Sequence, residues 1–325
     1  MQKLQEFQGI FEKYLSENSF ERPPGELYQP VDYILSLGGK RLRPVLVLTG
    51  CHLFHDEVTP ALPAAMAIEV FHNFSLVHDD IMDAAPLRRG QPTVHTRFDT
   101  NTAILSGDVM LIYTYDYLCQ LKDRQKIGQI ISVFNKVAIK VCEGQQYDMN
   151  FEKQADVSIP DYLKMIELKT AVLIAGSLKI GAMIGGAGQE DAEHLWEFGR
   201  NIGIAFQLQD DYLDTFGDPE KFGKKIGGDI AQHKKTFLIL KALEVATPEV
   251  RHKLQTYLAL PESEEQLKIQ KVTAILTALN LPQLIKEKRD AYRQEAYQHL
   301  SEVSIPEEAK QILYEMSEML IQREV

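Results

Sequence analysis

Apolar residues recur every three or four positions along almost the whole chain, as in Leu4, Phe7, Phe11 and Leu15. This spacing places them on one face of a helix, whereas the strict alternation that indicates a half-buried strand is scarce. The pattern is interrupted only by short clusters of proline and glycine, such as residues 23–25, which are typical of connections between packed helices. The chain is therefore predicted to be all-α, with about a dozen helices.

The chain of 325 residues contains no long polar segment that could serve as a flexible linker between domains. It also contains no repeat of fixed period and no tract of low complexity. We therefore expect a single domain over residues 1–325. The part after about residue 247, where prolines separate shorter charged helices, is expected to form an outer layer.

One segment, residues 171–188, is nearly all apolar or small and approaches the length of a membrane span. Lys179 lies in its middle, however, and a charge at the centre of a bilayer is costly. Its glycines suit close packing in a soluble helical core as well as in a membrane. We expect a buried helix and no membrane span.

The first seven residues carry polar and acidic side chains where a signal peptide would need an apolar run. The three cysteines, at positions 51, 119 and 142, are too far apart for a zinc site and too few for a disulfide framework. Both features predict a cytoplasmic protein.

The formal net charge is −11, so the chain lacks the broad basic surface that binding to nucleic acid requires. No nucleic-acid partner is expected. An anionic ligand would have to be held by local basic side chains or by metal ions, because the overall field of the protein repels it.

Two acidic clusters with the same spacing end two strongly apolar segments: Asp79-Asp80-Ile81-Met82-Asp83 and Asp210-Asp211-Tyr212-Leu213-Asp214. On a helix the first and last aspartates of each cluster share a face, one turn apart, where they repel one another. One such cluster could be an ordinary solvated helix face. Two of them, flanked by apolar residues, predict partly buried carboxylates that need a cation.

Carboxylate oxygens without nearby histidine or cysteine favour magnesium or manganese over zinc. Such ligands fill only part of an octahedron and leave places for phosphate oxygens and water, so a metal-bridged diphosphate is expected. The competing interpretation is a di-iron carboxylate bundle. It would need Glu-x-x-His pairs on facing helices, and none is suitably placed in the sequence.

Several basic residues stand near these clusters. The segment Gly-Gly-Lys-Arg-Leu-Arg-Pro at residues 38–44 precedes a helix, where backbone N–H groups favour anions. Arg88 and Arg89 follow the first cluster, Lys169-Thr170 lies in an otherwise apolar helix, and Lys224, Lys225, Lys234 and Lys235 follow the second cluster. Each group alone could be solvated surface, but together they suggest a shared multivalent anion.

The two clusters, the residue 38–44 segment, Arg88-Arg89-Gly90 and Lys169-Thr170, in this order, resemble the motifs of the trans-isoprenyl diphosphate synthases, or polyprenyl synthetases, over essentially the whole chain. The resemblance implies an all-α isoprenoid-synthase-type helical bundle around a deep central cavity, usually as a homodimer. It implies that three magnesium ions, which manganese can replace, bridge an allylic diphosphate to the two clusters. The implied reaction is the head-to-tail (1'-4) condensation of isopentenyl diphosphate with dimethylallyl, geranyl or farnesyl diphosphate.

The resemblance also implies individual roles. The direct metal ligands would be Asp79, Asp83 and Asp210, with Asp80 and Asp214 completing the metal-binding motifs. The diphosphate of isopentenyl diphosphate would contact Lys40, Arg43, His72 and Arg89, and the allylic diphosphate would contact Arg88, Lys169, Lys224 and Lys234. Thr170 and Gln207 would lie beside the reacting allylic carbon and would form the catalytic set with Lys169 and the three direct ligands. Without the resemblance, His72 would more often be an ordinary helix histidine.

Product length should depend on the bulk of the cavity floor. Phe71 and Phe74 stand eight and five positions before Asp79 and are expected to point down the cavity. An aromatic residue at position 74 followed by the small Ser75 is similar to short-chain synthases. We expect a C20 geranylgeranyl product, with C15 farnesyl as the close alternative.

Three other functions compete with this interpretation. A terpene cyclase shares the bundle and the first acidic motif, but its second motif is of an Asn/Ser/Glu type. A non-catalytic regulatory subunit of a heteromeric synthase tends to lack one acidic motif, and both are intact here. A helical scaffold with solvated acidic patches would require the two clusters and the basic segments to coincide by chance.

Overall fold

The structure is a computed structural model and describes residues 2–154, 156–218 and 226–321. These residues form helices almost throughout, and the strands among them are two residues long, which confirms the predicted all-α class. By their internal contacts the residues divide into two compact units. Unit 1 comprises residues 1–137, 176–196 and 303–312, and unit 2 comprises residues 138–175, 197–302 and 313–325. The prediction of a single domain stays a prediction.

The elements of unit 1 are α1 (Gln2–Glu17), α2 (Gly25–Ser36), α3 (Leu42–His52), η1 (Thr59–Ala61), α4 (Leu62–Met82), β1 (Leu87–Arg88), β2 (Gln91–Pro92), α5 (Val94–Arg97) and α6 (Thr100–Cys119). Those of unit 2 are α8 (Ile159–Ile166), η2 (Glu167–Ala171), α12 (Gly228–Ala231), α13 (Phe237–Val245), α14 (Pro248–Leu258), η3 (Glu262–Glu264), α15 (Glu265–Ala278) and α16 (Leu281–Ser301). Four helices contribute residues to both units: α7 (Arg124–Lys153), α9 (Val172–Gly185), α10 (Gln189–Phe216) and α17 (Glu307–Ile321).

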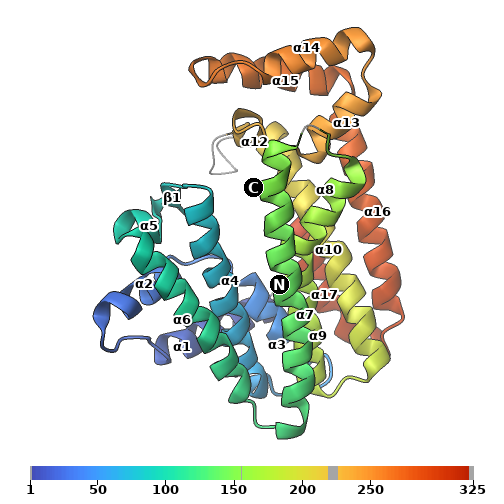
Figure 1. Ribbon diagram of the computed structural model, residues 1–325. Coiled ribbons are helices and arrows are strands. Elements are labelled where there is room, and N and C mark those ends of the chain that lie inside the picture. The colour runs from blue at the N-terminus through green and yellow to red at the C-terminus, as the bar shows by residue number, and fades with distance from the viewer. Residues whose placement is uncertain (1, 155, 219–225, 322–325) are drawn as a thin grey trace. The chain divides into compact units, whose positions relative to one another are not determined.

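Helix α4 is the central element of unit 1, where it packs against α3 and α6 (Figure 1). More than half of its residues are buried, because apolar residues fill almost every face of its first three turns. The contact with α6 is close at Gly107, where an added Cβ would lie 2.2 Å from the His78 ring. The apolar character of α4 thus fixes the position of the acidic cluster at its end.

The predicted packing of small residues is present in α9. A Cβ added to Gly181 would lie 2.0 Å from the carbonyl oxygen of Val47 on α3, and one added to Gly50 would lie 2.3 Å from that of Leu178. The two backbones are therefore in direct contact, which side chains at these positions would prevent. By length and composition the helical run Ile159–Gly185 could cross a membrane, but 72% of its most apolar window is buried. That burial favours the interpretation as a core helix.

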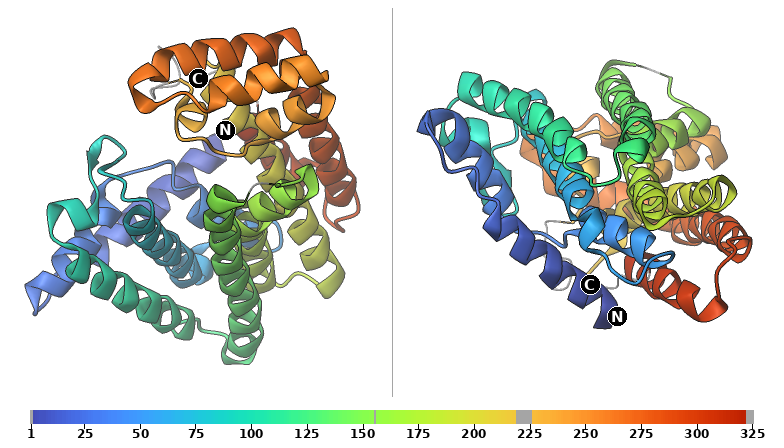
Figure 2. Two further views of the ribbon diagram at one scale, coloured as in Figure 1. Left: turned by 45° about the horizontal axis from the view of Figure 1, so that its top comes forward. Right: turned by 90° about the horizontal axis from the view of Figure 1, so that it is seen from below.

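Unit 2 is built around a hydrophobic core from α8, α10, α13, α15 and α16. Helices α14 and α15 lie side by side, as the left view of Figure 2 shows. The segment after residue 247 is more than the outer layer that its sequence suggested, since Leu254, Val272 and Leu276 belong to this core. Charged residues such as Arg251, Lys253 and Lys271 are exposed, whereas Lys268 is buried and contacts His233.

Candidate active site

The first acidic cluster ends α4 in unit 1. Asp79 is half-buried and Asp83 is exposed, and the Asp83 N–H donates to the Asp79 carbonyl at 2.9 Å. Asp80 is different, because only 1% of it is exposed. Its carboxylate accepts hydrogen bonds from the Arg88 guanidinium at 2.7 to 2.9 Å. Asp80 is therefore neutralised by Arg88, whose guanidinium also lies 3.8 Å from the Asp79 carboxylate.

Arg88 reaches Asp80 because the chain turns back immediately after α4. Strands β1 and β2 pair with Arg88 opposite Gln91, and the two residues between them, Arg89 and Gly90, have φ of 53° and 75°. Positive φ at both positions is the geometry of a tight type I′ hairpin turn. The turn directs Arg88 to Asp80, while the Arg89 guanidinium donates to the carbonyl of Gly38.

The segment before α3 separates its cations. Arg41 is 7% exposed and points inward, where it donates to Glu69 and to the carbonyl of Leu35, both at 2.5 Å. Arg43 lies on the first turn of α3 and contacts His72 Nε2 at 3.0 Å. Arg41, which was not assigned to a ligand, therefore balances the buried Glu69. Lys40 is exposed.

Positive charge is concentrated around Arg43 and His72. Burial lowers the pKa of Arg43 to about 10, although nearby Glu69 opposes the shift. Burial, followed by the charges of Arg43 and Arg89, lowers the pKa of His72 well below its ordinary value. The buried Nε of Arg43 has no hydrogen-bond partner among the described residues. A buried donor without a partner next to several cations is suited to an anionic ligand.

The three predicted chain-length residues lie on α4 in different surroundings. Phe71 is 1% exposed and packs edge-on against Phe134 at 5.1 Å. Phe74 is half-buried and contacts the His78 ring at 4.8 Å. The hydroxyl of Ser75 donates to the His72 carbonyl at 2.8 Å. Phe71 is therefore part of the core, and Phe74 is the more accessible of the two rings.

The second acidic cluster lies near the end of α10 in unit 2 and has a similar division. Asp210 is half-buried, and Asp211 is 4% exposed. The Asp211 carboxylate accepts hydrogen bonds from the Tyr162 hydroxyl and, at 3.3 Å, from the Gln207 amide. Burial, followed by the charge of Asp229, raises the pKa of Asp211 to about 8.

Asp214 accepts a hydrogen bond at 3.0 Å from the N–H of Asp229 and so holds the segment that follows the cluster. Lys234 belongs to that segment, and its Nζ lies 4.0 Å from the Asp229 carboxylate. Lys224, also predicted to contact the allylic diphosphate, lies outside the described residues. Lys234 therefore lies in the segment that Asp214 holds next to the second acidic cluster.

Lys169 and Thr170 belong to η2, which is a π-helical segment between α8 and α9. Single π turns within α-helices are rare and are frequent at functional sites. Lys169 Nζ donates to Asp148 at 2.6 Å. The Thr170 hydroxyl donates to the Gln207 carbonyl at 3.3 Å. The predicted residues Lys169, Thr170, Gln207 and Asp210 are thus gathered within unit 2.

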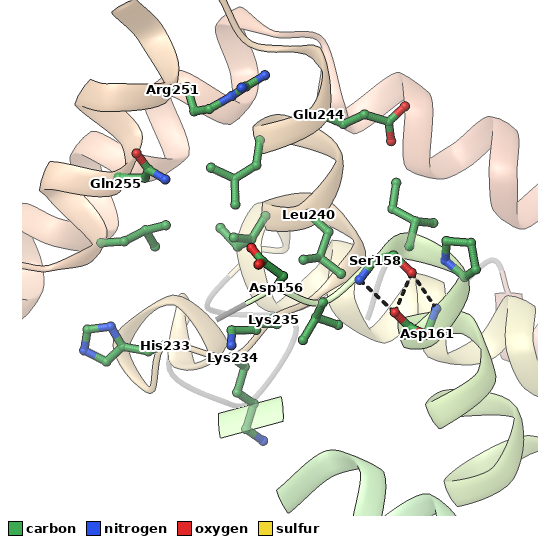
Figure 3. A pocket seen from close by; sticks show the side chains of 16 residues that line it. Asp156, Ser158, Asp161, His233, Lys234, Lys235, Leu240, Glu244, Arg251 and Gln255 are labelled. Atoms are coloured by element: carbon green, nitrogen blue, oxygen red, sulfur yellow. Dashed lines mark hydrogen bonds between the residues drawn. The ribbon is translucent and has the colours of Figure 1, made fainter. Parts of the chain in front are cut away.

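A separate cavity of about 990 Å³ opens in unit 2 between the start of α8 and helices α13 and α14 (Figure 3). Of the residues predicted for the site, only Lys234 lines it. Its polar lining is largely engaged already. Ser158 and Asp161 form the capping box of α8, and Lys235 donates to the Phe151 carbonyl at 2.7 Å. This cavity is therefore distinct from the residues that carry the predicted chemistry.

Sequence reasoning missed three residues that hold the site residues in place: Glu69, Asp148 and Tyr162. Each is a single polar residue on a helix, and only its tertiary contact reveals its role. The two acidic clusters, in contrast, could be recognised from the sequence because both have the same spacing of aspartates.

The described residues contain no group of three or more acidic, histidine or cysteine side chains that could hold a metal ion, but the carboxylates of each cluster are hard oxygen donors. Asp79 and Asp83 on α4, and Asp210 on α10, present carboxylate oxygens. Magnesium is commonly held by one or two carboxylates together with water and substrate phosphates. The carboxylates of each cluster are therefore of the chemical type that magnesium prefers.

Comparison with known proteins agrees with these features. The model of the polyprenyl synthetase family matches residues 24–276. A short chain isoprenyl diphosphate synthase of Methanothermobacter thermautotrophicus is 38% identical over 254 residues, which cover 78% of each chain. A geranylfarnesyl diphosphate synthase of Aeropyrum pernix is 34% identical over 298 residues, covering 90% of this chain and 92% of the other. A crystal structure of a geranylgeranyl pyrophosphate synthase superposes with a TM-score of 0.94 at 43% identity and covers 98% of each chain. The chain is therefore a prenyltransferase of the polyprenyl synthetase family.

Proposed function

We propose that the protein catalyses the magnesium-dependent, head-to-tail condensation of isopentenyl diphosphate with an allylic diphosphate. The observation that carries this proposal is the positive charge around His72 in unit 1. Burial and the charges of Arg43 and Arg89 lower the pKa of His72, and the buried Arg43 Nε has no hydrogen-bond partner among the described residues. A diphosphate would supply the missing negative charge and acceptor oxygens.

In this proposal the cations of unit 1 bind isopentenyl diphosphate. Arg43 and Arg89 provide guanidinium groups that can bind phosphate in a bidentate manner. His72 is neutral because of its lowered pKa and contributes a directional hydrogen bond. Lys40 adds an exposed ammonium group at the same segment.

The second proposed ligand is the allylic diphosphate with its metal ions. Asp79, Asp83 and Asp210 would be the direct ligands of three magnesium ions, which manganese can replace, and Asp80 and Asp214 would support them from their present hydrogen bonds. When bound, the ions would stabilise the negative charge that grows on the departing diphosphate. Arg88, Lys169, Lys224 and Lys234 would contribute positive charge to the same leaving group.

The residues near the reacting carbon act through dipoles and exclusion of water. The Thr170 hydroxyl donates to the side-chain carbonyl oxygen of Gln207. The dipoles of these two side chains would stabilise positive charge on the allylic carbon. The double bond of isopentenyl diphosphate then forms the new carbon–carbon bond, and the proton lost afterwards is accepted by the released diphosphate. No protein group has to act as the general base.

The proposed product is C20 geranylgeranyl diphosphate, with C15 farnesyl diphosphate as the close alternative. The half-buried Phe74 ring provides the bulk that limits chain growth. The similar proteins named as geranylgeranyl and geranylfarnesyl diphosphate synthases support a short product. We further propose that the protein acts as a cytoplasmic homodimer.

Two alternative functions remain to be distinguished by experiment. A terpene cyclase would convert the allylic diphosphate into a cyclic hydrocarbon, and a regulatory subunit would bind a catalytic partner without turnover. The presence of Asp79, Asp83 and Asp210 together favours a catalytic synthase over both.

The test is product analysis of purified protein incubated with magnesium, labelled isopentenyl diphosphate, and dimethylallyl, geranyl or farnesyl diphosphate in turn. A C20 or C15 prenyl diphosphate is expected. Absence of elongation with every starter would support the regulatory subunit, and a cyclised hydrocarbon would support the cyclase. Omission of magnesium with added chelator is expected to abolish elongation.

A further inference from the structure

Tyr162 on α8 contacts the second acidic cluster at Asp211. It is 2% exposed, and its hydroxyl donates to Asp211 Oδ2. The other carboxylate oxygen, Oδ1, accepts from the side-chain amide of Gln207 at 3.3 Å. The amide's carbonyl oxygen accepts in turn from the hydroxyl of Thr170. Four side chains from α8, η2 and α10 therefore form one chain of hydrogen bonds within unit 2.

We propose that Tyr162 is a positioning residue for prenyl elongation, whose hydroxyl fixes the Asp211 carboxylate so that this carboxylate orients the amide of Gln207 toward Thr170. The inference rests on the proposed function, because Gln207 and Thr170 matter only if they face the reacting allylic carbon. Tyr162 itself is fully enclosed and does not touch substrate.

The hydrogen-bonding groups determine the direction of the amide. In the structure the Asp211 carboxyl group accepts one hydrogen bond from the phenol and one from the amide, with the NH₂ group of Gln207 facing it. The carbonyl end is then left on the side of Thr170. If the carboxylate rotated, nothing in this chain of contacts would prevent the amide of Gln207 from turning over, because the Thr170 hydroxyl can donate to a carbonyl or accept from an NH₂ group.

Tyr162 is the group that prevents this rotation. The Asp211 side chain is nearly enclosed, so water cannot replace a lost phenol hydrogen bond easily. The phenol also lies on a rigid ring with few rotatable bonds, and α8 is anchored at its start by a complete capping box at Ser158. The Tyr162 hydroxyl therefore has a fixed position, and its hydrogen bond fixes the orientation of the Asp211 carboxyl group.

The deciding variant is Tyr162→Phe, which removes the hydroxyl and keeps the ring. We expect kcat to fall by about tenfold to a hundredfold, as misplacement of a reacting group by about 1 Å does. The KM for isopentenyl diphosphate is expected to stay unchanged, since its proposed cations lie in unit 1. The matched control is Tyr257→Phe, because Tyr257 packs against the same core but is not a contact of Asp211. That variant should keep wild-type kinetics.

A double-mutant cycle separates positioning from a purely structural role. If Tyr162 acts through Gln207, then Tyr162→Phe combined with Gln207→Leu should be no slower than Gln207→Leu alone, within about twofold. Effects of the two substitutions that multiply would overturn the proposal, as would wild-type kcat in Tyr162→Phe. A loss confined to KM for isopentenyl diphosphate would overturn it too.

A second variant covers the case in which Tyr162→Phe does not fold. Asp211→Asn still accepts from Tyr162 but turns an NH₂ group toward Gln207, so the Gln207 amide is expected to reverse and kcat to fall to a similar degree. Unchanged kcat in Asp211→Asn would contradict the orientation argument. If wild-type protein elongates no starter, the proposed function fails and this inference falls with it, whereas an active wild type with unaffected variants refutes the inference alone.

Discussion

Gly144 on α7 lies directly against the π-helical segment that carries Lys169 and Thr170. A Cβ added at this position would lie 2.3 Å from the backbone nitrogen of Lys169 and 2.6 Å from its Cα. Ordinary contacts of a Cβ begin at 3.4 Å, so in Gly144→Ala the two backbones have to separate by about 1 Å. Neither side can yield by rotating a side chain, because both contacting groups are backbone atoms.

The size of the effect follows from two opposed contributions. Overpacking of this kind costs about 1–3 kcal/mol, while replacing glycine by alanine inside a helix stabilises by about 0.5–1 kcal/mol. The same helix offers a matched control in Gly128, which is exposed and has no atom within 4 Å of an added Cβ. Gly128→Ala should gain only the helical contribution, so the difference between the two variants isolates the clash at about 1–3 kcal/mol.

The displacement should also slow the reaction, because it moves Lys169 and Thr170 relative to Gln207. A shift of about 1 Å predicts a loss in kcat of up to about a hundredfold. Urea unfolding and steady-state elongation assays of wild type, Gly144→Ala and Gly128→Ala measure both effects. If Gly144→Ala matched Gly128→Ala in stability and in kcat, the packing of α7 on the π-helical segment would not position these residues.

Three further predictions follow from the site and the core. Asp79→Ala and Asp210→Ala should each remove nearly all turnover while leaving the circular dichroism spectrum unchanged, and normal elongation by either variant would contradict its assignment as a direct metal ligand. Phe74→Ala should lengthen the product, as read by chromatography of the dephosphorylated prenols, and an unchanged distribution would mean that another residue limits growth. Burial raises the pKa of the Cys51 thiol to about 11, so at pH 8 only about one molecule in a thousand carries the thiolate. Iodoacetamide should therefore modify the exposed Cys119 well before Cys51, with the rate at Cys51 rising as the pH approaches 11, and equal rates at pH 8 would contradict its burial.

The all-α class and the buried character of α9 could be predicted because both depend on local pattern. Spacing of three and four residues defines a helix face, and a charge such as Lys179 within an apolar run argues against a membrane span. The π turn at Lys169 could not be predicted, because it depends on the close approach of other backbones, including that at Gly144. The core role of Leu254 was hidden for a different reason, since most residues of its helix are polar or charged.

The basic segment before α3 shows where residue type alone is insufficient. Arg41 and Arg43 are two positions apart and identical in chemistry, yet Arg41 pairs with the buried Glu69 while Arg43 lies beside His72. The difference comes from the backbone, because Arg41 has a φ of 47° as the residue that precedes α3. The left-handed conformation turns its side chain inward. The sequence indicated that a cationic segment precedes a helix. It did not indicate which of the cations forms an ion pair inside the protein.

The two acidic clusters have the same spacing because a helix imposes the same geometry on both. Successive residues are about 100° apart around the axis, so the first and last aspartates of each cluster share a face and the second one points elsewhere. In each cluster that second residue, Asp80 or Asp211, is the buried one. The protein neutralises Asp80 with the guanidinium of Arg88 and holds Asp211 with the neutral donors of Tyr162 and Gln207. In both clusters the middle aspartate is thus an anchor within the fold, and cation binding is proposed for Asp79, Asp83 and Asp210. Because the two anchors differ, substitution of Asp80 should free the guanidinium group of Arg88. Substitution of Asp211 should instead change the orientation of the Gln207 amide.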